Sequence, residues 1–180
     1  MEIVITLIVV ILLAALAITA WNGYKLSKLR ASFGPEYEQL TKQHGSKRAA
    51  DRELQRRRQL HSRLTLQPIT SEDHDHFAES WKHLQGTFID DPRLALASAE
   101  KLVGKVLDAR GYPGVDADER LALLSVEYAE TLPDYRAAQQ ISRRVQDNSV
   151  PTSTEDMRQA LLSYRKLFDE LLNSAVMASV

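Results

Sequence analysis

The stretch FIDDPRLALASAEKLVGKVLDARGYP, residues 88–113, decides the fold because it contains one whole amphipathic helix with its start and stop signals. Asp91 is a favoured N-cap and Pro92 suits the first helical turn. The apolar positions between the signals recur at helical spacing and are Leu94, Ala95, Ala99, Leu102, Val103, Val106 and Leu107. Gly111 suits the left-handed position after a helix, and Pro113 prevents continuation. The acidic pair and the Arg-Gly-Tyr-Pro segment are therefore explained as helix ends, without catalysis.

The same signals predict four further helices between residue 67 and the C-terminus. Helix starts are indicated at Thr70, at Asp116 with Glu119, at Thr131 with Pro133, and at Thr152 or Ser153. The apolar stripes that follow contain Phe77, Trp81, Leu84 and Phe88; Leu121, Leu124 and Tyr128; Tyr135, Ala138, Ile141 and Val145; and Met157, Leu161, Tyr164, Phe168, Leu171 and Leu172. No alternating strand pattern appears. The sequence predicts an all-α fold with a compact bundle of about five helices over residues 67–180.

The N-terminal run IVITLIVVILLAALAITA, residues 3–20, has no charged residue. Its length approaches the roughly 30 Å of a bilayer core, and Trp21 adds an interfacial anchor. A cleaved signal peptide is the alternative, with Ala15-Leu16-Ala17 as a small-residue cleavage site. We favour an uncleaved transmembrane anchor over residues 1–23, because the run is long and Glu2 replaces the basic residue that a signal peptide requires.

Charge is divided unevenly along the rest of the chain. Residues 24–63 carry eleven Lys or Arg against four Asp or Glu, whereas residues 64–180 carry twelve against nineteen. Basic residues follow the apolar run and none precedes it, so the positive-inside rule places the N-terminus outside and the soluble part in the cytoplasm. The absence of cysteine is compatible with a reducing compartment.

Residues 24–66 are predicted to form a basic, polar juxtamembrane helix with a thin apolar stripe, interrupted at Gly45. We expect it to lie on another surface or in solvent, beside anionic lipid headgroups. The residues predicted to contact the lipid surface are Lys25, Lys28, Arg30, Lys47, Arg48, Arg56, Arg57 and Arg58. Nucleic acid is a less favoured partner, because the basic run lacks interleaved aromatic residues.

A resemblance to a known family rests on several short segments: FGPEYE (33–38), Trp81 followed by Gln85, Phe88 and DDP (90–92), RGYP (110–113), YRAA (135–138) and STEDMRQALLSYRKLFDELL (153–172). In this combination the chain resembles a family of small, uncharacterised bacterial single-pass membrane-anchored proteins. The resemblance covers nearly all of the chain after the anchor. It implies one N-terminal membrane segment and a helical soluble part, and it carries no activity, cofactor or site residue. Some such proteins are labelled secreted, which the charges flanking the apolar run argue against here.

His76, Glu79 and His83 share one helical face and form the candidate metal site of the sequence. The competing interpretation is a solvated helix flank, because the set lacks a fourth ligand. No phosphate-binding loop, dinucleotide fingerprint or nucleophile motif is present, so the sequence predicts no catalytic residue and no cofactor. We expect a membrane-tethered, non-catalytic interaction or regulatory module with a protein partner. The alternatives are a metal-binding protein or metal-dependent enzyme, and an exported helical domain released by signal cleavage.

Overall fold

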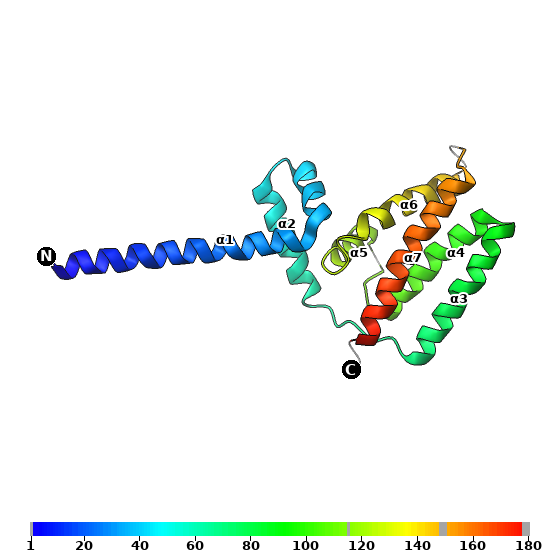
Figure 1. Cartoon of the computed structure of the whole chain (residues 1–180), viewed down its shortest axis with the longest axis horizontal. Coiled ribbons are helices and arrows are strands. Elements are labelled where there is room, and N and C mark those ends of the chain that lie inside the picture. The colour runs from blue at the N-terminus through cyan, green and yellow to red at the C-terminus, as the bar shows by residue number, and fades with distance from the viewer. Residues whose placement is uncertain (1, 115, 148–150, 178–180) are drawn as a thin grey trace.

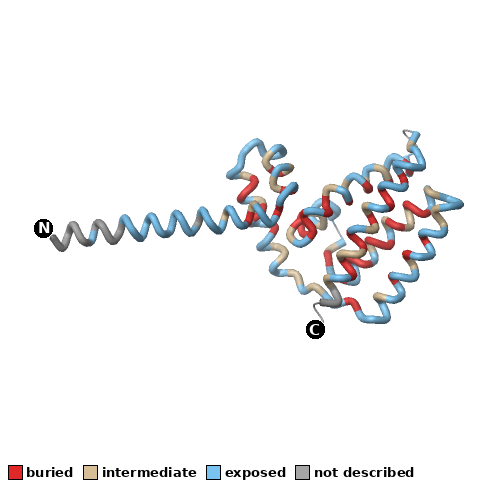
Figure 2. The backbone as a smooth tube through the Cα atoms, in the orientation of Figure 1, coloured by how far each residue is buried: buried red, intermediate tan, exposed pale blue. Residues whose placement is uncertain are grey.

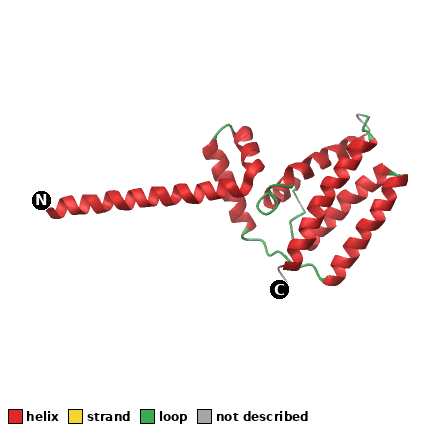
Figure 3. Ribbon diagram, viewed as in Figure 1, coloured by secondary structure: helices red, strands yellow, loops and turns green. Residues whose placement is uncertain are grey.

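The computed structural model describes residues 2–114, 116–147 and 151–177, and the side chains of these residues except 2–6, 8–11, 22 and 175–177. The described residues form helices and connecting turns, with no strand among them (Figures 1 and 3). The helices are α1 (Glu2–His44), α2 (Lys47–His61), α3 (Ser71–Asp90), α4 (Pro92–Ala109), α5 (Ala117–Leu124), α6 (Leu132–Asp147) and α7 (Thr154–Met177). The predicted all-α fold is confirmed, and each of the five predicted bundle helices is present as α3 to α7.

The bundle core lies where α4 and α7 pack on each other and on their neighbours, with α3 against α4 and α6 against α7. Trp81 of α3 is fully buried, and its ring centroid lies 4.8 Å from that of Phe168 of α7. The Tyr135 ring of α6 meets the Tyr164 ring of α7 edge-on at 5.6 Å. These aromatic pairs contribute packing energy beyond the burial of apolar area. The apolar stripes predicted from helical spacing therefore provide contacts between the helices of the bundle.

The helix starts follow the predicted chemistry. The Asp91 carboxylate accepts a hydrogen bond from the Leu94 amide at 3.0 Å, which satisfies a donor that the first turn leaves unpaired. At the start of α7 the Ser153 hydroxyl accepts from the Asp156 amide at 3.0 Å, and the Asp156 carboxylate accepts from the Ser153 amide at 3.2 Å. This reciprocal pair is a capping box. Leu94 itself is exposed, so it does not belong to the buried face of α4 predicted for it.

The Arg-Gly-Tyr-Pro segment ends α4 and also fastens the linker between α2 and α3. Gly111 has φ of 86°, as predicted for the residue after a helix, and a Cβ at this position would lie 3.1 Å from the Thr65 carbonyl oxygen. Arg110 is buried and donates to the Gln67 carbonyl at 3.1 Å, while its own carbonyl accepts from the Gln67 amide at 3.0 Å. The linker is thus held against the end of α4.

The predicted juxtamembrane helix is divided between the end of α1 and α2, because Gly45 turns the chain with φ of 62°. A second bend lies inside α1 at Gly34, where φ is 37° and ψ is −116°, immediately before Pro35. The bend brings the last part of α1 against α2 (Figure 1). A second apolar cluster fills this hairpin and consists of Leu29, Phe33, Leu40, Ala50, Leu54 and Ala129. The segment therefore has a core of its own, which the sparse apolar stripe did not predict.

The first part of α1 projects away from the body of the molecule (Figure 1). Among the described residues, no helix combines the length and hydropathy that a bilayer crossing requires. The predicted anchor, residues 1–23, lies partly outside the described residues, since the side chains of 1–6, 8–11 and 22 are not described. α1 runs past the predicted boundary at residue 23 without a break.

Candidate functional site at the junction of α1, α2 and the bundle

A buried carboxylate joins α1 to two arginines from elsewhere in the chain. Glu36, on the turn after the Gly34 bend, is only 1% exposed. It accepts from Arg57 Nη1 of α2 at 2.7 Å, and from Arg136 Nη1 and Nη2 of α6 at 2.6 and 2.9 Å. The arginines lie 21 and 100 residues away along the chain. One acidic side chain thus ties the hairpin to the bundle.

The two arginines also donate to other side chains. Arg57 Nη1 donates to the Ser125 hydroxyl at 3.0 Å, and its Nε donates to Glu53 at 2.9 Å. Arg136 Nη1 donates to the Gln39 side-chain oxygen at 2.9 Å. Buried charges are tolerated where such hydrogen bonds replace those lost to water. The network therefore connects α1, α2, the turn after α5, and α6.

Both acids of this network are held in their ionised form. Burial alone would raise the pKa of Glu36, but the hydrogen bonds and positive charges of Arg136 and Arg57 outweigh it and place the pKa below its usual value. Hydrogen bonds from Arg56 and Arg57 overcome partial burial at Glu53 and lower its pKa to about 2. Carboxylates that stay ionised at neutral pH are poor proton donors, so the arrangement is suited to fastening rather than to acid catalysis.

A second ion pair closes the hairpin on the side of α1 before the bend. Arg30 Nε and Nη2 donate to the two Asp51 oxygens at 2.8 and 2.6 Å, a bidentate geometry. The same guanidinium lies 5.5 Å from the centroid of the Tyr37 ring, within the range of a cation–π contact. The hairpin is thus fixed on both sides of the Gly34 bend.

The described residues along the first part of α1 are exposed (Figure 2), and several of them have large apolar side chains. They are Leu7, Leu12, Leu13, Leu16, Ile18, Trp21 and Tyr24, each between 58% and 66% exposed. Isolated exposed apolar residues are ordinary on soluble proteins, whereas an extended apolar surface indicates contact with a partner or a membrane. This surface ends where Leu29 enters the hairpin core.

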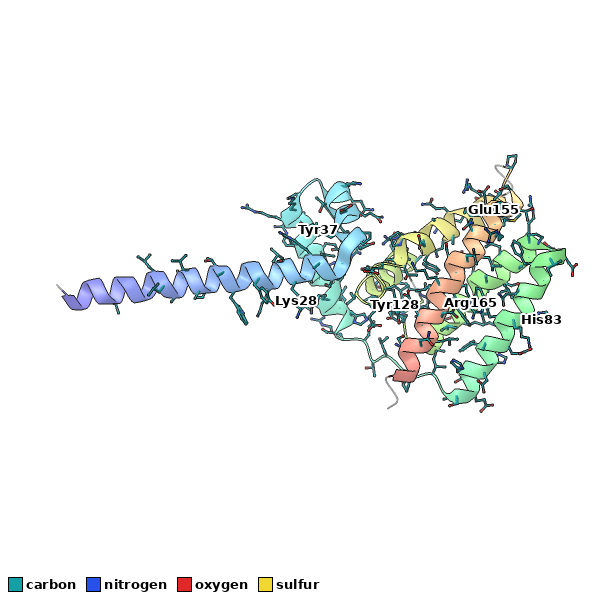
Figure 4. All side chains as sticks on the ribbon, viewed as in Figure 1. Lys28, Tyr37, His83, Tyr128, Glu155 and Arg165 are labelled. Carbon is teal, nitrogen blue, oxygen red and sulfur yellow. The ribbon has the colours of Figure 1, made fainter. Side chains whose placement is uncertain are left out.

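The residues predicted to contact lipid have different environments. For Arg57 the prediction is wrong: its side chain is 9% exposed, because Glu36 and Glu53 hold it inside. Arg30 and Arg56 are paired with Asp51 and Glu53 respectively. Lys47 and Arg48 are exposed in the first turn of α2. Lys25, Lys28 and Arg58 line one hollow at the base of the projecting part of α1, where Figure 4 labels Lys28.

The three candidate metal ligands lie on α3, on the side of the bundle away from α1 (Figure 4, His83). Within the described part of the chain, no three histidine or acidic side chains form a group that could hold a metal ion. His76, Glu79 and His83 are all exposed. Glu79 instead lies 3.9 Å from Lys82, and the His76 ring lies 6.0 Å from that of Phe77. The structure therefore does not bring these residues together as ligands.

The buried tyrosines have structural partners. Tyr164 and Ser142 hydroxyls lie 2.9 Å apart, and those of Tyr128 and Ser174 lie 2.8 Å apart. Burial raises the pKa of Tyr135 to about 12, and it raises the pKa of Tyr164 as well. Neutral, hydrogen-bonded phenols at helix seams pack the core, and they are not activated for chemistry.

No protein-family model, curated protein or solved structure matches this chain. The junction therefore stands on its own geometry. Sequence reasoning missed it, although two of the segments that carry the resemblance, FGPEYE and YRAA, contain Glu36 and Arg136. An acid in one segment and an arginine in another were the available signal, but nothing in their spacing joins residues 100 positions apart.

Proposed function

We propose that this chain is a single-pass, membrane-anchored, non-catalytic module that holds a helical bundle at the inner face of the cell membrane for contact with a protein partner. The first part of α1 inserts into the bilayer. The remainder of the chain lies in the cytoplasm, with the N-terminus outside.

The observation that carries this proposal is the apolar surface of α1, from Leu7 to Trp21, on a helix that continues into the body of the molecule. Exposure of several large apolar side chains to water costs free energy that insertion into lipid recovers, at about 25 cal/mol per Å². Trp21 at the end of the apolar segment and Lys25 one turn later match the order of side chains at a membrane interface. The apolar side chains of this part of α1 are therefore compatible with an environment of lipid acyl chains.

The junction formed by Glu36, Arg57 and Arg136 links the proposed anchor to the bundle. A flexible linker would leave the bundle free to move away from the membrane, whereas here α1 itself is tied to α2 and α6 through Glu36, Arg57 and Arg136. The bundle half of the chain is acidic, with nineteen Asp or Glu against twelve Lys or Arg over residues 64–180. A partner with a basic contact surface is favoured by charge complementarity.

The experiment that tests the anchor and its orientation uses the absence of cysteine in the chain. Asn173→Cys places a single thiol at an exposed position of α7, and Glu2→Cys places one before the apolar run. We expect a membrane-impermeant maleimide to label Glu2→Cys in intact cells, and Asn173→Cys only after the cells are opened. The full-length chain should remain in the membrane pellet after an alkaline wash. Labelling of Asn173→Cys in intact cells, or a shortened chain, would overturn the proposed orientation or the uncleaved anchor.

The interaction half of the proposal has its own test. Chemical crosslinking of the full-length chain in cells should give a discrete crosslinked product containing a second protein, captured through the bundle. Turnover of a substrate by the purified chain, with no such product, would contradict a non-catalytic role.

A further inference from the structure

Two hollows share the same walls where the projecting part of α1 meets α2. One has a volume of about 600 Å³ and is lined by Tyr24, Lys25, Lys28, Leu29, Ser32, Phe33, Arg58 and Val126. The other, of about 410 Å³, is lined by Lys25, Leu26, Leu29, Gln55 and Arg58. We name the combined space the basal cleft. The volume of each hollow is within the roughly 300–1,000 Å³ typical of ligand sites.

The basal cleft has an apolar floor and cationic walls. Leu29 and Phe33 are buried beneath it, while Lys25, Lys28 and Arg58 are exposed at its edges. Among the described residues, no acidic group forms an ion pair with any of these three cations. By contrast, Arg30, Arg56 and Arg57 of the same hairpin each have an acidic partner. The cleft therefore offers three positive charges that the protein itself leaves uncompensated.

The position of the cleft along α1 places it at headgroup depth. Trp21 belongs at the boundary between acyl chains and headgroups, and Lys25 Nζ lies 5.4 Å from the centroid of its ring. At 1.5 Å per residue, Lys25 and Lys28 lie roughly 6 and 10 Å beyond Trp21 along the helix. The headgroup layer on each side of a bilayer is roughly 5–8 Å thick. A lipid phosphate beside α1 would thus lie at the level of Lys25, and the long side chain of Lys28 would reach back to it from just beyond this layer.

From this coincidence of charge, shape and depth we infer that the basal cleft binds the phosphate headgroup of one anionic phospholipid, held between Lys25 and Lys28 of α1 and Arg58 of α2. The inference rests on the proposed membrane insertion of α1, and it adds a defined site to a general attraction of basic residues for the membrane. Tyr24 and Val126 line the same hollow, where they would contact the apolar part of the lipid near its glycerol backbone. The arginine contributes a planar, bidentate donor and the lysines contribute point charges.

The test compares two triple variants of the full-length chain in micelles of a neutral detergent. Lys25→Gln/Lys28→Gln/Arg58→Gln removes the cations of the cleft. Lys42→Gln/Arg52→Gln/Arg63→Gln removes the same charge from exposed positions of the same hairpin outside the cleft. Native mass spectrometry counts the lipid molecules retained during titration with short-chain phosphatidylglycerol or phosphatidylcholine. All six positions are exposed, so both variants should keep the unfolding temperature of the wild type, which circular dichroism checks.

We expect the wild type to retain one phosphatidylglycerol and to prefer it over phosphatidylcholine. The cleft variant should bind it at least about tenfold more weakly, whereas the matched variant should stay within about twofold. Equal loss in both variants, or equal binding of phosphatidylcholine, would overturn the site. Displacement of the lipid by inorganic phosphate or glycerol phosphate at equal concentration would assign the cleft to a soluble phosphate compound and overturn the lipid.

Failure of the site and failure of the proposed function are distinguishable. Membrane fractionation of cells that express the cleft variant should still find it in the pellet, because α1 is unchanged. A wild-type chain absent from the membrane fraction would contradict the anchor, whatever the micelle titration showed.

Discussion

Glu36 is an interior carboxylate whose two arginine partners belong to different helices. Its amide analogue, Glu36→Gln, keeps the size of the side chain but leaves the buried Arg57 without one of its two counter-charges. Removing one charge of a buried ion pair leaves the desolvation of the other charge less well compensated. We therefore expect a loss of about 3 kcal/mol in the free energy of unfolding. Chemical denaturation of the full-length chain in detergent measures it.

The matched control is Glu38→Gln, which removes the same charge from an exposed position two residues away. It should change stability by less than about 0.5 kcal/mol. Equal losses of stability in the two variants would mean that the ion pairs of Glu36 contribute no more to folding than any negative charge on this part of α1.

Acid should weaken the same junction. A carboxyl whose folded pKa is lowered contributes stability that is complete above its unfolded pKa and is lost as pH falls toward the folded value. For Glu53 this window runs from its usual 4.5 down to about 2, and the lowered pKa of Glu36 acts in the same direction. We expect the unfolding temperature to fall across this range, and Glu53→Gln to flatten the decline. Glu130→Gln, at an exposed position, should leave the slope of the wild type unchanged.

Arg56-Arg57-Arg58 shows the limit of prediction at the scale of residues. Successive residues on a helix point about 100° apart, so three adjacent arginines face three directions. Arg57 enters the junction, Arg56 pairs with Glu53, and Arg58 lines the basal cleft. From the sequence, all three arginines were predicted to contact lipid. A basic run shows its composition, but it does not show which of its arginines lies beside an acidic residue from a distant part of the chain.

At the scale of elements, the bend at Gly34 depends on a backbone conformation that L-residues avoid. No atom lies within 4 Å of a Cβ built there, so Gly34→Ala tests backbone strain without steric overlap. We expect it to cost about 1–2 kcal/mol. Gly86→Ala, inside α3 and equally unobstructed, should instead stabilise the protein by about 0.5–1 kcal/mol. Thermal unfolding of both variants checks the opposite signs; a gain at Gly34 would contradict the bend.

The helices of the bundle were predictable because their signals are local. A cap such as Asp91 and an apolar stripe such as Phe77, Trp81 and Leu84 are complete within one element. The hairpin core was not predictable, because Leu29, Leu40 and Leu54 are sparse along the sequence and become a cluster only after two turns at glycine bring them together. The cleft at the base of α1 was missed for the same reason, although its lysines are among the residues predicted to contact the lipid surface.

At the scale of the whole molecule, both apolar clusters begin after the projecting part of α1. Among the side chains that the structure describes, Leu26 is the first apolar residue packed against either cluster. We therefore expect a chain that lacks residues 1–23 to keep the helices of the remaining residues and its cooperative unfolding while losing membrane association. Circular dichroism and cell fractionation measure the two properties. A truncated chain that fails to fold would show that the apolar segment is needed for more than attachment.

The docking of the hairpin on the bundle could not be derived from pattern. It depends on Glu36 meeting Arg136, on Arg57 meeting Ser125, and on Ala129 completing a core built mainly from α1 and α2. Such long-range pairs carry no periodicity, and a single sequence offers no covariation to reveal them. The sequence predicted separate parts, whereas the structure shows how they are joined.

α1 continues from the proposed membrane interface into the hairpin, and this continuity sets the rotation of the bundle about the axis of α1. Adding one residue to α1 between Trp21 and Leu29 would lift everything beyond it by about 1.5 Å and turn it by about 100° around the helix axis. The number of residues between Trp21 and Leu29 therefore determines which face the bundle presents along the membrane plane. After the insertion of one residue, another protein in the same membrane would meet a different face of the bundle.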